Sequence, residues 1–448
     1  MAITWYIARG GSDNNSGSRV STSAYASGTG ASTSGTTTVS LLADNPDLSG
    51  VVDSQDTIRI NGVVRGLYSS DIYKITAHNN TAGVKTVTIS SASPAVGSPV
   101  TATGQTWAIG GSFATPTRAC NVVNADGSEE IRICAGDNTG SDSLALNGSG
   151  CTTARAATNS NAPIKITGCN TSGTPYAGSA FAMIEDTGST SAFGINANSA
   201  HNFYWARDIH LYNLSGSITQ QFTAGTSWRV EHCKVESCSG GFKAGGHGSF
   251  IDCTALNNTG GYGFQDRAEY IRCIALWTSG GISATGFYIT SNATTAIGAA
   301  LVDCLVHGTE GIGVDIINSA AATGIVIIKN CTLDGCATGI QIDYGFNNQI
   351  IHIRNNLISN NSSYGVLVNS GTGYIILESN HFDSNGTDVS GSTTTDDTKT
   401  SGDPQFVDRA NHDFHITRFS SAARWDRMIL SSYAGCYAPY LKKHIQTG

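Results

Sequence analysis

The sequence predicts an all-β fold, a right-handed single-stranded parallel β-helix with a small N-terminal β region and a C-terminal capping segment. Two observations point to it. A phrase with a cysteine near its centre recurs about every 20 to 31 residues in the second half of the chain, and repeats at such intervals indicate a solenoid or a propeller. Between the phrases, apolar and polar residues alternate as in strands, and glycine and asparagine mark the turns.

The composition supports many short strands and excludes several classes of protein. Only 13% of the 448 residues are charged and 53 are glycine, while 40% are hydrophobic, which argues against disorder. The net charge of −8 disfavours a nucleic acid partner, because phosphate binding needs clustered lysine and arginine. No secretory signal opens the chain and no apolar run approaches a membrane span. We therefore expect synthesis in the cytoplasm and no membrane insertion.

The cysteine phrases align into one column, which we expect to form a ladder of stacked side chains near a bend of the coil. Cysteine fills space at such a site, and asparagine can hydrogen-bond the coils above and below. Upstream, Ile209 occupies the same column. The structural ladder then contains Cys233, Cys253, Cys273, Cys304, Cys331, Asn356 and Asn380.

The twelve cysteines admit three interpretations. Disulfides need an oxidising compartment, which the missing signal disfavours. Zinc sites usually pair their ligands at close spacing, and the only close pairs are Cys233/Cys238 and Cys331/Cys336. We favour buried free thiols that act as small apolar side chains, and we expect no metal and no cofactor.

A second column begins where a glycine precedes an apolar residue after each phrase. Side chains alternate across a strand, so the apolar residue should point inward and the next residue outward. The inward column contains Phe242, Phe264, Phe287, Val314, Ile340 and Val366. The outward column contains Lys243, Gln265, Tyr288, Asp315, Gln341 and Leu367.

Three regions follow one another along the chain. We expect residues 1–118 to form a small β domain for attachment, or irregular first coils. We expect residues 119–390 to form the parallel β-helix, with regular coils from 202 to 390. We expect residues 391–448 to form a polar loop and a segment for capping or oligomerisation that is rich in aromatic residues.

The repeats resemble the pectate-lyase-like superfamily of parallel β-helices. The opening "YIARGGSDNNSG" is similar to the start of many such proteins, and "GDPQFVDRANHDFHIT" is similar to their common ending. The phrase "AGCYAPY" resembles a terminal phrase of the superfamily, whereas "SSAAR" departs from its usual S-P-A segment. Within the superfamily, glycine-rich members of low charge and without a signal resemble bacteriophage virion proteins such as tailspikes and head spikes.

This resemblance implies a bacteriophage virion structural protein, a tailspike, fibre or head spike, that binds a host cell-surface polysaccharide. It also implies a homotrimer, contacts with other virion proteins and a location in the virion. Two alternatives stay open. One is a polysaccharide lyase or glycoside hydrolase of the same fold, acting as a depolymerase; the other is a purely structural capsid or tail decoration protein.

The outward column is the candidate glycan-binding surface. Parallel β-helices can bind long saccharides along a strand face, because ladders present the same spacing over many coils. Tyr288 would stack on a sugar ring, and its neighbours would hydrogen-bond the hydroxyl groups. The candidate residues are Lys243, Gln265, Tyr288, Asp315 and Gln341. An ordinary solvated face is the alternative.

Catalysis would need more than this column. Glycoside hydrolysis requires two carboxylates at the scissile bond, and Asp315 and Asp343 are candidates on adjacent coils, two residues out of register. β-Elimination would need a base beside a carboxylate-bound Ca²⁺, and no stacked aspartate cluster is evident for it. His412 and His415 are three apart in a predicted strand, so they point to opposite faces and suit no single metal ion.

A further outward column, one residue after the cysteines, contains three aliphatic residues, Ile274, Leu305 and Leu357. Stacked aliphatic side chains are unusual on a free surface. They face either a loop of the same chain or, as our hypothesis, the neighbouring subunits of a trimer.

Overall fold

The computed structural model describes residues 4–416 apart from a set of gaps. The gaps are residues 10, 14, 22, 62–70, 95–100, 115–117, 120–128, 137–143, 146–150, 153–163, 186–194, 197–203, 215–219, 225–228, 245–247, 279–283, 292–296, 319–323, 344–349, 370–373, 392–394 and 398–399. The aromatic residues Trp425, Tyr433, Tyr437 and Tyr440 lie outside the described residues. The chain divides into two compact units, Met1–Ser217 with Gly225–Trp228, and Ile218–Ala224 with Arg229–Gly448.

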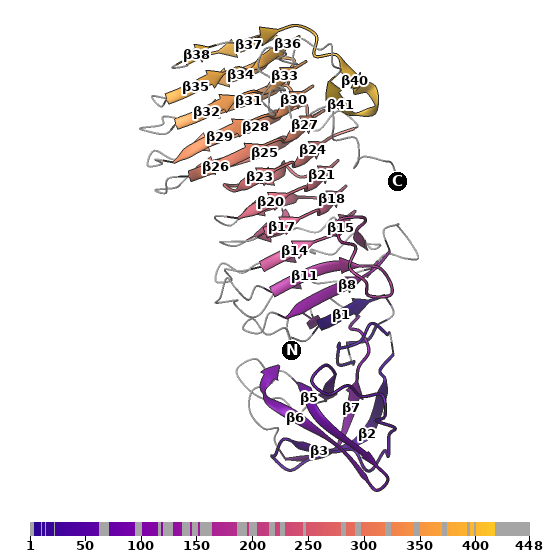
Figure 1. Ribbon diagram of the computed structural model, residues 1–448. Coiled ribbons are helices and arrows are strands. Elements are labelled where there is room, and N and C mark those ends of the chain that lie inside the picture. Colours follow the sequence, from indigo (N-terminus) through magenta and orange to yellow (C-terminus); the bar gives the residue numbers. More distant parts are fainter. Residues whose placement is uncertain are drawn as a thin grey trace, which may run out of the picture. The chain divides into compact units, whose positions relative to one another are not determined.

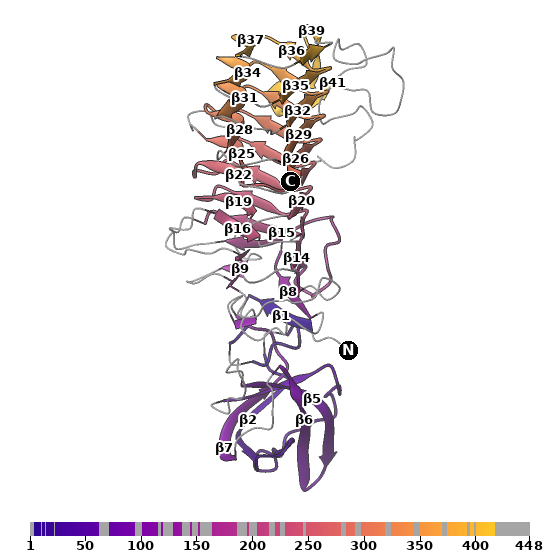
Figure 2. The same ribbon diagram turned by 90° about the vertical axis from the view of Figure 1, so that its left-hand side faces the viewer.

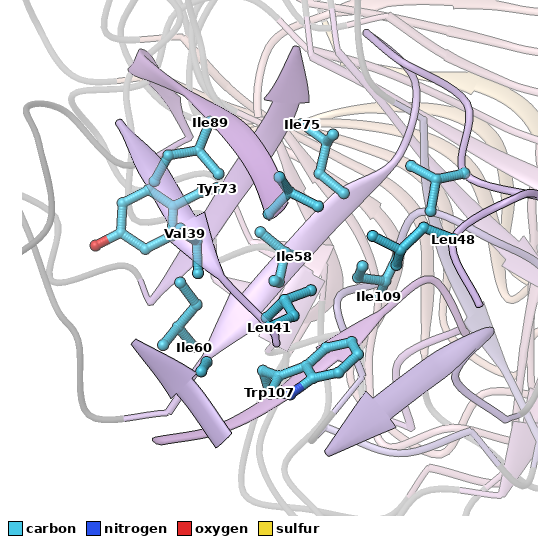
Figure 3. Packing of buried hydrophobic residues seen from close by; sticks show 13 residues of the cluster. Val39, Leu41, Leu48, Ile58, Ile60, Tyr73, Ile75, Ile89, Trp107 and Ile109 are labelled. Atoms are coloured by element: carbon cyan, nitrogen blue, oxygen red, sulfur yellow. The ribbon is translucent and has the colours of Figure 1, made fainter. Parts of the chain in front are cut away.

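The first unit contains a closed antiparallel barrel, whose strands lie at the indigo and violet end of Figure 1. In barrel order its strands are β2 (Ala26–Thr33), β3 (Thr38–Ser40), β6 (Val84–Pro94), β5 (Ile72–Thr81), β4 (Thr57–Ile60) and β7 (Ala102–Ile109). Alternate side chains of these strands point inward and fill the barrel, as Figure 3 shows for Ile58, Ile75 and Trp107. The barrel is therefore a packed core and not a ligand cavity.

The first unit also contains parallel strands outside the barrel. One sheet has the order β1 (Thr4–Ala8), β8 (Glu130–Cys134), β11 (Ile164–Cys169) and β14 (Tyr204–Arg207). A second pairs β10 (Cys151–Thr152) with β13 (Ile195–Asn196), and a third has the order β9 (Leu144–Ala145), β12 (Ala182–Glu185) and β15 (Ile209–Tyr212). Because β1 pairs with β8, a boundary at residue 118 would separate the first strand from its partner.

The second unit is a stack of coils in which the chain visits three parallel sheets in turn (Figure 1 and Figure 2). Sheet I contains β17 (Arg229–Glu231), β20 (Ser249–Ile251), β23 (Glu269–Ile271), β26 (Ile297–Val302), β29 (Ile325–Lys329), β32 (Ile350–Arg354), β35 (Tyr374–Glu378) and β38 (Thr395–Asp397). Sheet II contains β18 (Lys234–Glu236), β21 (Thr254–Leu256), β24 (Ile274–Leu276), β27 (Leu305–His307), β30 (Thr332–Asp334), β33 (Leu357–Ser359), β36 (His381–Asp383) and β39 (Thr400–Ser401). Sheet III contains β16 (Gln220–Ala224), β19 (Gly241–Ala244), β22 (Tyr262–Gln265), β25 (Thr285–Ser291), β28 (Ile312–Asn318), β31 (Thr338–Asp343), β34 (Tyr364–Val368) and β37 (Thr387–Ser390).

In the coils from β17 to β36, one residue makes the turn from sheet I to sheet II. It has a left-handed backbone conformation and directly precedes the ladder position, which explains why the repeat places polar residues such as Asp252 and Asn330 there. These residues are His232, Asp252, Arg272, Asp303, Asn330, Asn355 and Ser379.

The glycine column at the start of the strands of sheet III has a steric cause. A Cβ atom on Gly313 would lie 2.5 Å from the carbonyl oxygen of Gly339 in the next coil, and one on Gly339 would lie 2.6 Å from that of Gly365. Only glycine lets the coils approach this closely.

The inward column predicted from the sequence is confirmed, because all six of its side chains are fully buried. Phe264 stacks on Phe242 and Phe287 with ring centroids 4.9 and 4.7 Å away, and Phe250 stacks on Tyr270 at 5.5 Å. Parallel in-register strands place like side chains above one another, so aromatic residues form stacks along the core.

A short hairpin follows the coils. It consists of β40 (Phe406–Asp408), the 3-10 turn η1 (Arg409–Asn411) and β41 (Asp413–Ile416). Across the described part of the chain, no helix has the length and hydropathy that a membrane span requires.

Candidate functional site

The outward column predicted from the sequence is a continuous in-register ladder on sheet III. Neighbouring members pair directly, in the order Lys243, Gln265, Tyr288, Asp315 and Gln341, and the ladder continues into Leu367. Adjacent strands lie about 4.8 Å apart, so these five side chains extend over about 19 Å. We call this set the polar row.

Two tyrosines form an aromatic surface at the middle of the polar row. The ring centroids of Tyr262 on β22 and Tyr288 on β25 lie 4.4 Å apart, with 37° between their planes. Burial raises the pKa of Tyr288, and the nearby Tyr262 and Asp315 add to this, so the phenol is neutral at physiological pH. Neutral aromatic faces of this kind can pack against the apolar face of a sugar ring.

Asp315 is a buried acid next to Tyr288 in the row. Its exposed fraction is 6%, and its Oδ1 atom has no hydrogen-bond partner among the residues that the structure describes. Burial, followed by the negative charge of Asp343, raises the pKa of Asp315 to about 6. A substantial fraction of Asp315 therefore carries a proton at pH 6 to 7, unlike an ordinary aspartate.

Asp343 is the second carboxylate of the site. Asp315 pairs with Gln341 and Ile317 pairs with Asp343, which puts the two acids on adjacent coils and two residues out of register. The Nε2 atom of Gln341 donates a hydrogen bond of 2.6 Å to Asp343 Oδ2, and the Nδ2 atom of Asn369 donates one of 2.6 Å to Oδ1. Both carboxylate oxygens thus have an amide donor that fixes their orientation.

A third acid, Asp266, lies towards the Lys243 end of the row. It follows β22 with a backbone φ of 72°, and Thr290 Oγ1 donates a hydrogen bond of 2.7 Å to its Oδ1 atom. Lys243 Nζ lies 3.9 Å from Asp266 Oδ2, and the lysine side chain keeps 33% of its surface exposed. A long, solvated ion pair of this kind binds weakly, so the ammonium group stays accessible to a ligand.

This arrangement can do two things chemically. The tyrosine pair and the amide and charged groups of the polar row can bind a chain of sugar units. In addition, a partly protonated acid beside an oriented carboxylate meets the first requirement of general acid and base catalysis.

Sequence reasoning identified the row and the two acids but missed Tyr262, Thr290 and Asn369. Tyr262 stood in the aligned phrase "YGFQD", two residues before the inward Phe264, so strict period-2 alternation would have placed it inward. The alternation breaks at Gly263, which is buried together with Phe264. Thr290 and Asn369 carry no sequence signal, because their hydrogen bonds depend on how neighbouring coils meet.

The structural ladder lies at the corner between sheets I and II, and its members are buried. The thiols of Cys253 and Cys273 donate to carbonyl oxygens of the preceding coil, those of Val230 and Phe250, at 3.5 and 3.2 Å. The amide of Asn380 donates to the carbonyl oxygen of Ile353 at 2.9 Å in the same way. All nine cysteines whose side chains the structure describes are free and buried.

Of the three aliphatic residues Ile274, Leu305 and Leu357, the first two pack against a segment of the same chain, which is the first of the two alternatives. Leu305 is 3% exposed and packs on Phe414 of the hairpin, with Ile274 and Phe406 at the edge of the cluster. Leu357 is fully buried. The hairpin covers this part of sheet II, so Leu305 and Leu357 are not available to a second chain.

Asp334 fixes the hairpin to the coils. It is fully buried, Arg409 Nε donates a hydrogen bond of 2.7 Å to its Oδ2 atom, and His307 Nδ1 lies 2.9 Å from the same oxygen. Ser359 and Asn360 donate to Oδ1 at 2.7 and 2.8 Å. The buried charge thus has partners from both sheet II and the hairpin.

The residues around the hairpin do not form a metal site in the described part of the chain, where no group of three or more histidine, cysteine, aspartate or glutamate side chains has suitable geometry. His412 has a left-handed backbone conformation with φ of 60° and lies in the turn before β41, so it is not in a strand with His415. Its ring centroid lies 5.2 Å from that of His307.

A family model described as a right handed beta helix region matches residues 221–402. No curated protein matches the sequence. Among solved structures, the A-module of the Azotobacter vinelandii mannuronan C-5 epimerase AlgE6 is similar, with 12% identity, 62% of this chain and 91% of that chain covered, and a TM-score of 0.37.

The catalytic domain of a GH87 α-1,3-glucanase in complex with tetrasaccharides is also similar, with 12% identity, 79% of this chain and 87% of that chain covered, and a TM-score of 0.35. At these identities the likeness concerns the fold alone. With the three parallel sheets of stacked coils, the matching family model identifies this chain as a protein with a right-handed parallel β-helix.

Proposed function

We propose that the polar row on sheet III binds a polysaccharide. The observation that carries this proposal is the position of the Tyr262–Tyr288 pair directly beside the buried acid Asp315 on an in-register ladder. An aromatic surface flanked by amide and charged groups offers both the apolar and the hydrogen-bonding contacts that a sugar needs. The repeat of the ladder suits a polymer better than a single small ligand, because it offers similar contacts over several coils.

A second candidate function, polysaccharide hydrolysis, is favoured by the raised pKa of Asp315. A carboxyl group with a pKa of about 6 can donate a proton to a glycosidic oxygen near neutral pH. Asp343, oriented by Gln341 and Asn369, would act as the base that activates water or as the nucleophile. The proton of Asp315 goes to the leaving sugar oxygen as the glycosidic bond breaks, and water supplies the new hydroxyl group.

We also propose a biological role, that of a bacteriophage virion protein. The chain would form a homotrimeric tailspike, fibre or head spike that contacts other virion proteins and binds a bacterial surface polysaccharide. Its support is that the repeats resemble the pectate-lyase-like superfamily, within which glycine-rich members of low charge resemble bacteriophage virion proteins. A purely structural decoration protein is the alternative. Labelling of intact particles with an antibody to the chain tests the location on head or tail.

The test of the proposed function is a binding screen by isothermal titration calorimetry against soluble bacterial polysaccharides of defined composition. Binding by the wild-type chain and at least tenfold weaker binding by Tyr288→Ala support a saccharide site on the polar row. Release of new reducing ends by the wild-type chain, and none by Asp315→Asn with binding retained, would assign hydrolysis in addition. No binding to any polysaccharide in a panel that includes the host surface glycan would refute the proposal.

A further inference from the structure

The three sheets of the second unit have outward faces of different chemistry. The face of sheet III carries the polar row, and part of the face of sheet II is covered by the hairpin. The outward face of sheet I is mainly apolar over six neighbouring strands, β20 to β35. We call the apolar residues that point outward there the apolar strip. It contains Ile251, Ile271, Ala300, Val302, Ile325, Ile327, Ile350, Tyr374 and Ile376.

The strip is separate from the core, because its residues alternate with the buried ones. On β29, Val326 and Ile328 are fully buried and point inward, while Ile325 and Ile327 are partly exposed. The same alternation holds on β32, where Ile351 and Ile353 are buried. Apolar side chains on both faces of β29 are typical of a strand that is covered on both faces, as in the interior of a layered protein.

The strip runs diagonally across three in-register ladders, and Glu269 and His352 interrupt the middle one. Ile251 pairs with Ile271 and Ile271 with Val302, while Ala300 pairs with Ile327. A parallel run pairs Ile325 with Ile350 and Ile350 with Tyr374. The strip therefore crosses six strands, about 24 Å at about 4.8 Å per strand.

Tyr374 shows most clearly that the strip is exposed to solvent. In a ladder each side chain is partly covered by its neighbours above and below. Partial exposure of Ile327 and Ile350 is therefore what we expect when no other segment lies on the ladder. Tyr374, near the end of the strip, is 58% exposed. By contrast, Leu305 on sheet II falls to 3% exposed because Phe414 lies on it.

One edge of the strip carries charges of both signs. The ladder of Ile251, Ile271 and Val302 continues in the next three coils as Lys329, Arg354 and Glu378. His352, within the face, lies with Nε2 3.1 Å from Glu378 Oε2. The glutamate at one end of this edge would repel a polyanion or an anionic membrane surface. A partner surface that also carries charges of both signs can instead pair each charge with one of opposite sign.

From these features we propose that the apolar strip is the contact between copies of this chain. A second copy presents the same apolar residues at the same spacing of about 4.8 Å, so that the side chains of two strips can interdigitate over several coils. It also presents the same mixed edge of Lys329, Arg354 and Glu378. A contact of like surfaces in a symmetric oligomer needs this self-complementarity. The inference does not depend on saccharide binding.

The proposal places the contact on a different face from Ile274, Leu305 and Leu357. Ile274 and Leu305 pack with Phe406 and Phe414 of the hairpin, and Leu357 is fully buried. The strip, by contrast, faces outward on sheet I. The polar row on sheet III stays outside the contact, so an oligomer would keep one polysaccharide site for each chain.

The experiment is the mass of the purified full chain by size-exclusion chromatography with light scattering at about 1 and about 100 µM, with variants Ile327→Asp and Ile350→Lys. Both positions are partly exposed and point outward, so a charge there stays outside the core. The expected result is a mass of two or three times 46.5 kDa for the wild type and 46.5 kDa for each variant. Val84→Asp, at an exposed valine of the barrel, is the matched control and should keep the wild-type mass.

Circular dichroism and a thermal melt of each variant establish that the chain is folded. If Ile327→Asp does not fold, the milder Ile327→Thr, expected to raise the dissociation constant at least tenfold, takes its place. A wild-type mass of one chain at both concentrations would overturn the proposal, and so would an oligomer whose mass and dissociation constant are unchanged in all folded strip variants.

Discussion

The backbone N–H of Cys331 donates a hydrogen bond of 2.8 Å to Oδ1 of Asn356, its neighbour in the structural ladder. Asn356 Nδ2 in turn donates to the carbonyl oxygen of Ile328 and to Oδ1 of Asn380, both at 3.0 Å. One fully buried amide thus satisfies groups in three successive coils. Cysteine at the same position only fills the space and donates one weak hydrogen bond from sulfur.

Replacing Asn356 by alanine should lower the free energy of unfolding by about 2–4 kcal/mol, because buried polar groups lose their partners. Asn356→Cys should cost less, because the chain itself uses cysteine in five other coils of the ladder. Urea unfolding of the three proteins checks this order. An alanine variant as stable as the wild type would show that the ladder amides contribute nothing.

The ladder thiols should be unreactive in the folded chain. Burial raises the pKa of Cys253, Cys273, Cys304 and Cys331, and the thiolate is the reactive form. Iodoacetamide at pH 8 followed by peptide mass mapping should find these four residues unmodified in native protein and modified in guanidinium chloride. Rapid native labelling of any of them would mean that this corner of the coil opens or is packed differently.

Stability should respond to the charge on Asp315. The pKa in the folded chain, about 6, is higher than the usual 3.8, so folding favours the protonated form. This favourable contribution is complete below about pH 4 and is lost as the pH rises through 6. Asp315→Asn should therefore raise the unfolding free energy at pH 7.5 by about 2–3 kcal/mol and by much less at pH 4.

Thermal melts of wild type and Asp315→Asn across this pH range make the comparison. Gln341→Glu, which adds a charge to the same row, is the opposite control and should lower stability at pH 7.5. A difference between wild type and Asp315→Asn that does not change with pH would contradict the raised pKa.

The hairpin should detach when Asp334 is lost. Burial alone would raise the pKa of Asp334, but hydrogen bonds from four side chains outweigh it and lower the pKa. The carboxylate therefore stabilises the fold above about pH 4, and this contribution is lost as the pH falls through the lowered pKa. Asp334→Asn should cost about 1–3 kcal/mol, since it removes the charged acceptor of the hydrogen bonds from Arg409, Ser359 and Asn360.

Hydrogen exchange over residues 406–416 is the measurement for this variant. Faster exchange there, with the amides of β19 and β22 unchanged, is the expected pattern. Phe414→Ala should give a similar but smaller effect, because it removes only the apolar contact with Leu305. Exchange rates equal to the wild type in Asp334→Asn would exclude the anchoring role.

The sequence predicted the repeating part of the fold well, because the repeat itself encodes it. Glycine at Gly313 and Gly339 is required by the close approach of coils, and the left-handed corner residues precede each ladder position. Both features recur with the coil, so they are visible as columns. The barrel was expected only as a small β region, because its antiparallel strands have no repeat that would distinguish closure from irregular coils.

The sequence predicted which residues of the site share one face of the sheet, but not their burial or their hydrogen bonds. Alternation places Tyr288, Asp315 and Gln341 on one face, and the register confirms that they are neighbours. Sequence could not show that Asp315 is buried or that Asn369 orients Asp343, since both depend on contacts between coils. For the same reason it could not show that Phe414 lies on Leu305, about a hundred residues away in the chain.

The most direct test of the central claim is the affinity of the chain for a polysaccharide ligand, measured by calorimetry for wild type, Tyr288→Ala and Val84→Ala. Val84 is the control, an exposed apolar residue of the barrel that lies neither on the polar row nor on the apolar strip. The account predicts at least tenfold weaker binding for Tyr288→Ala, about 1.4 kcal/mol or more, and wild-type affinity for Val84→Ala. Equal affinity of all three proteins would contradict a saccharide site on the polar row.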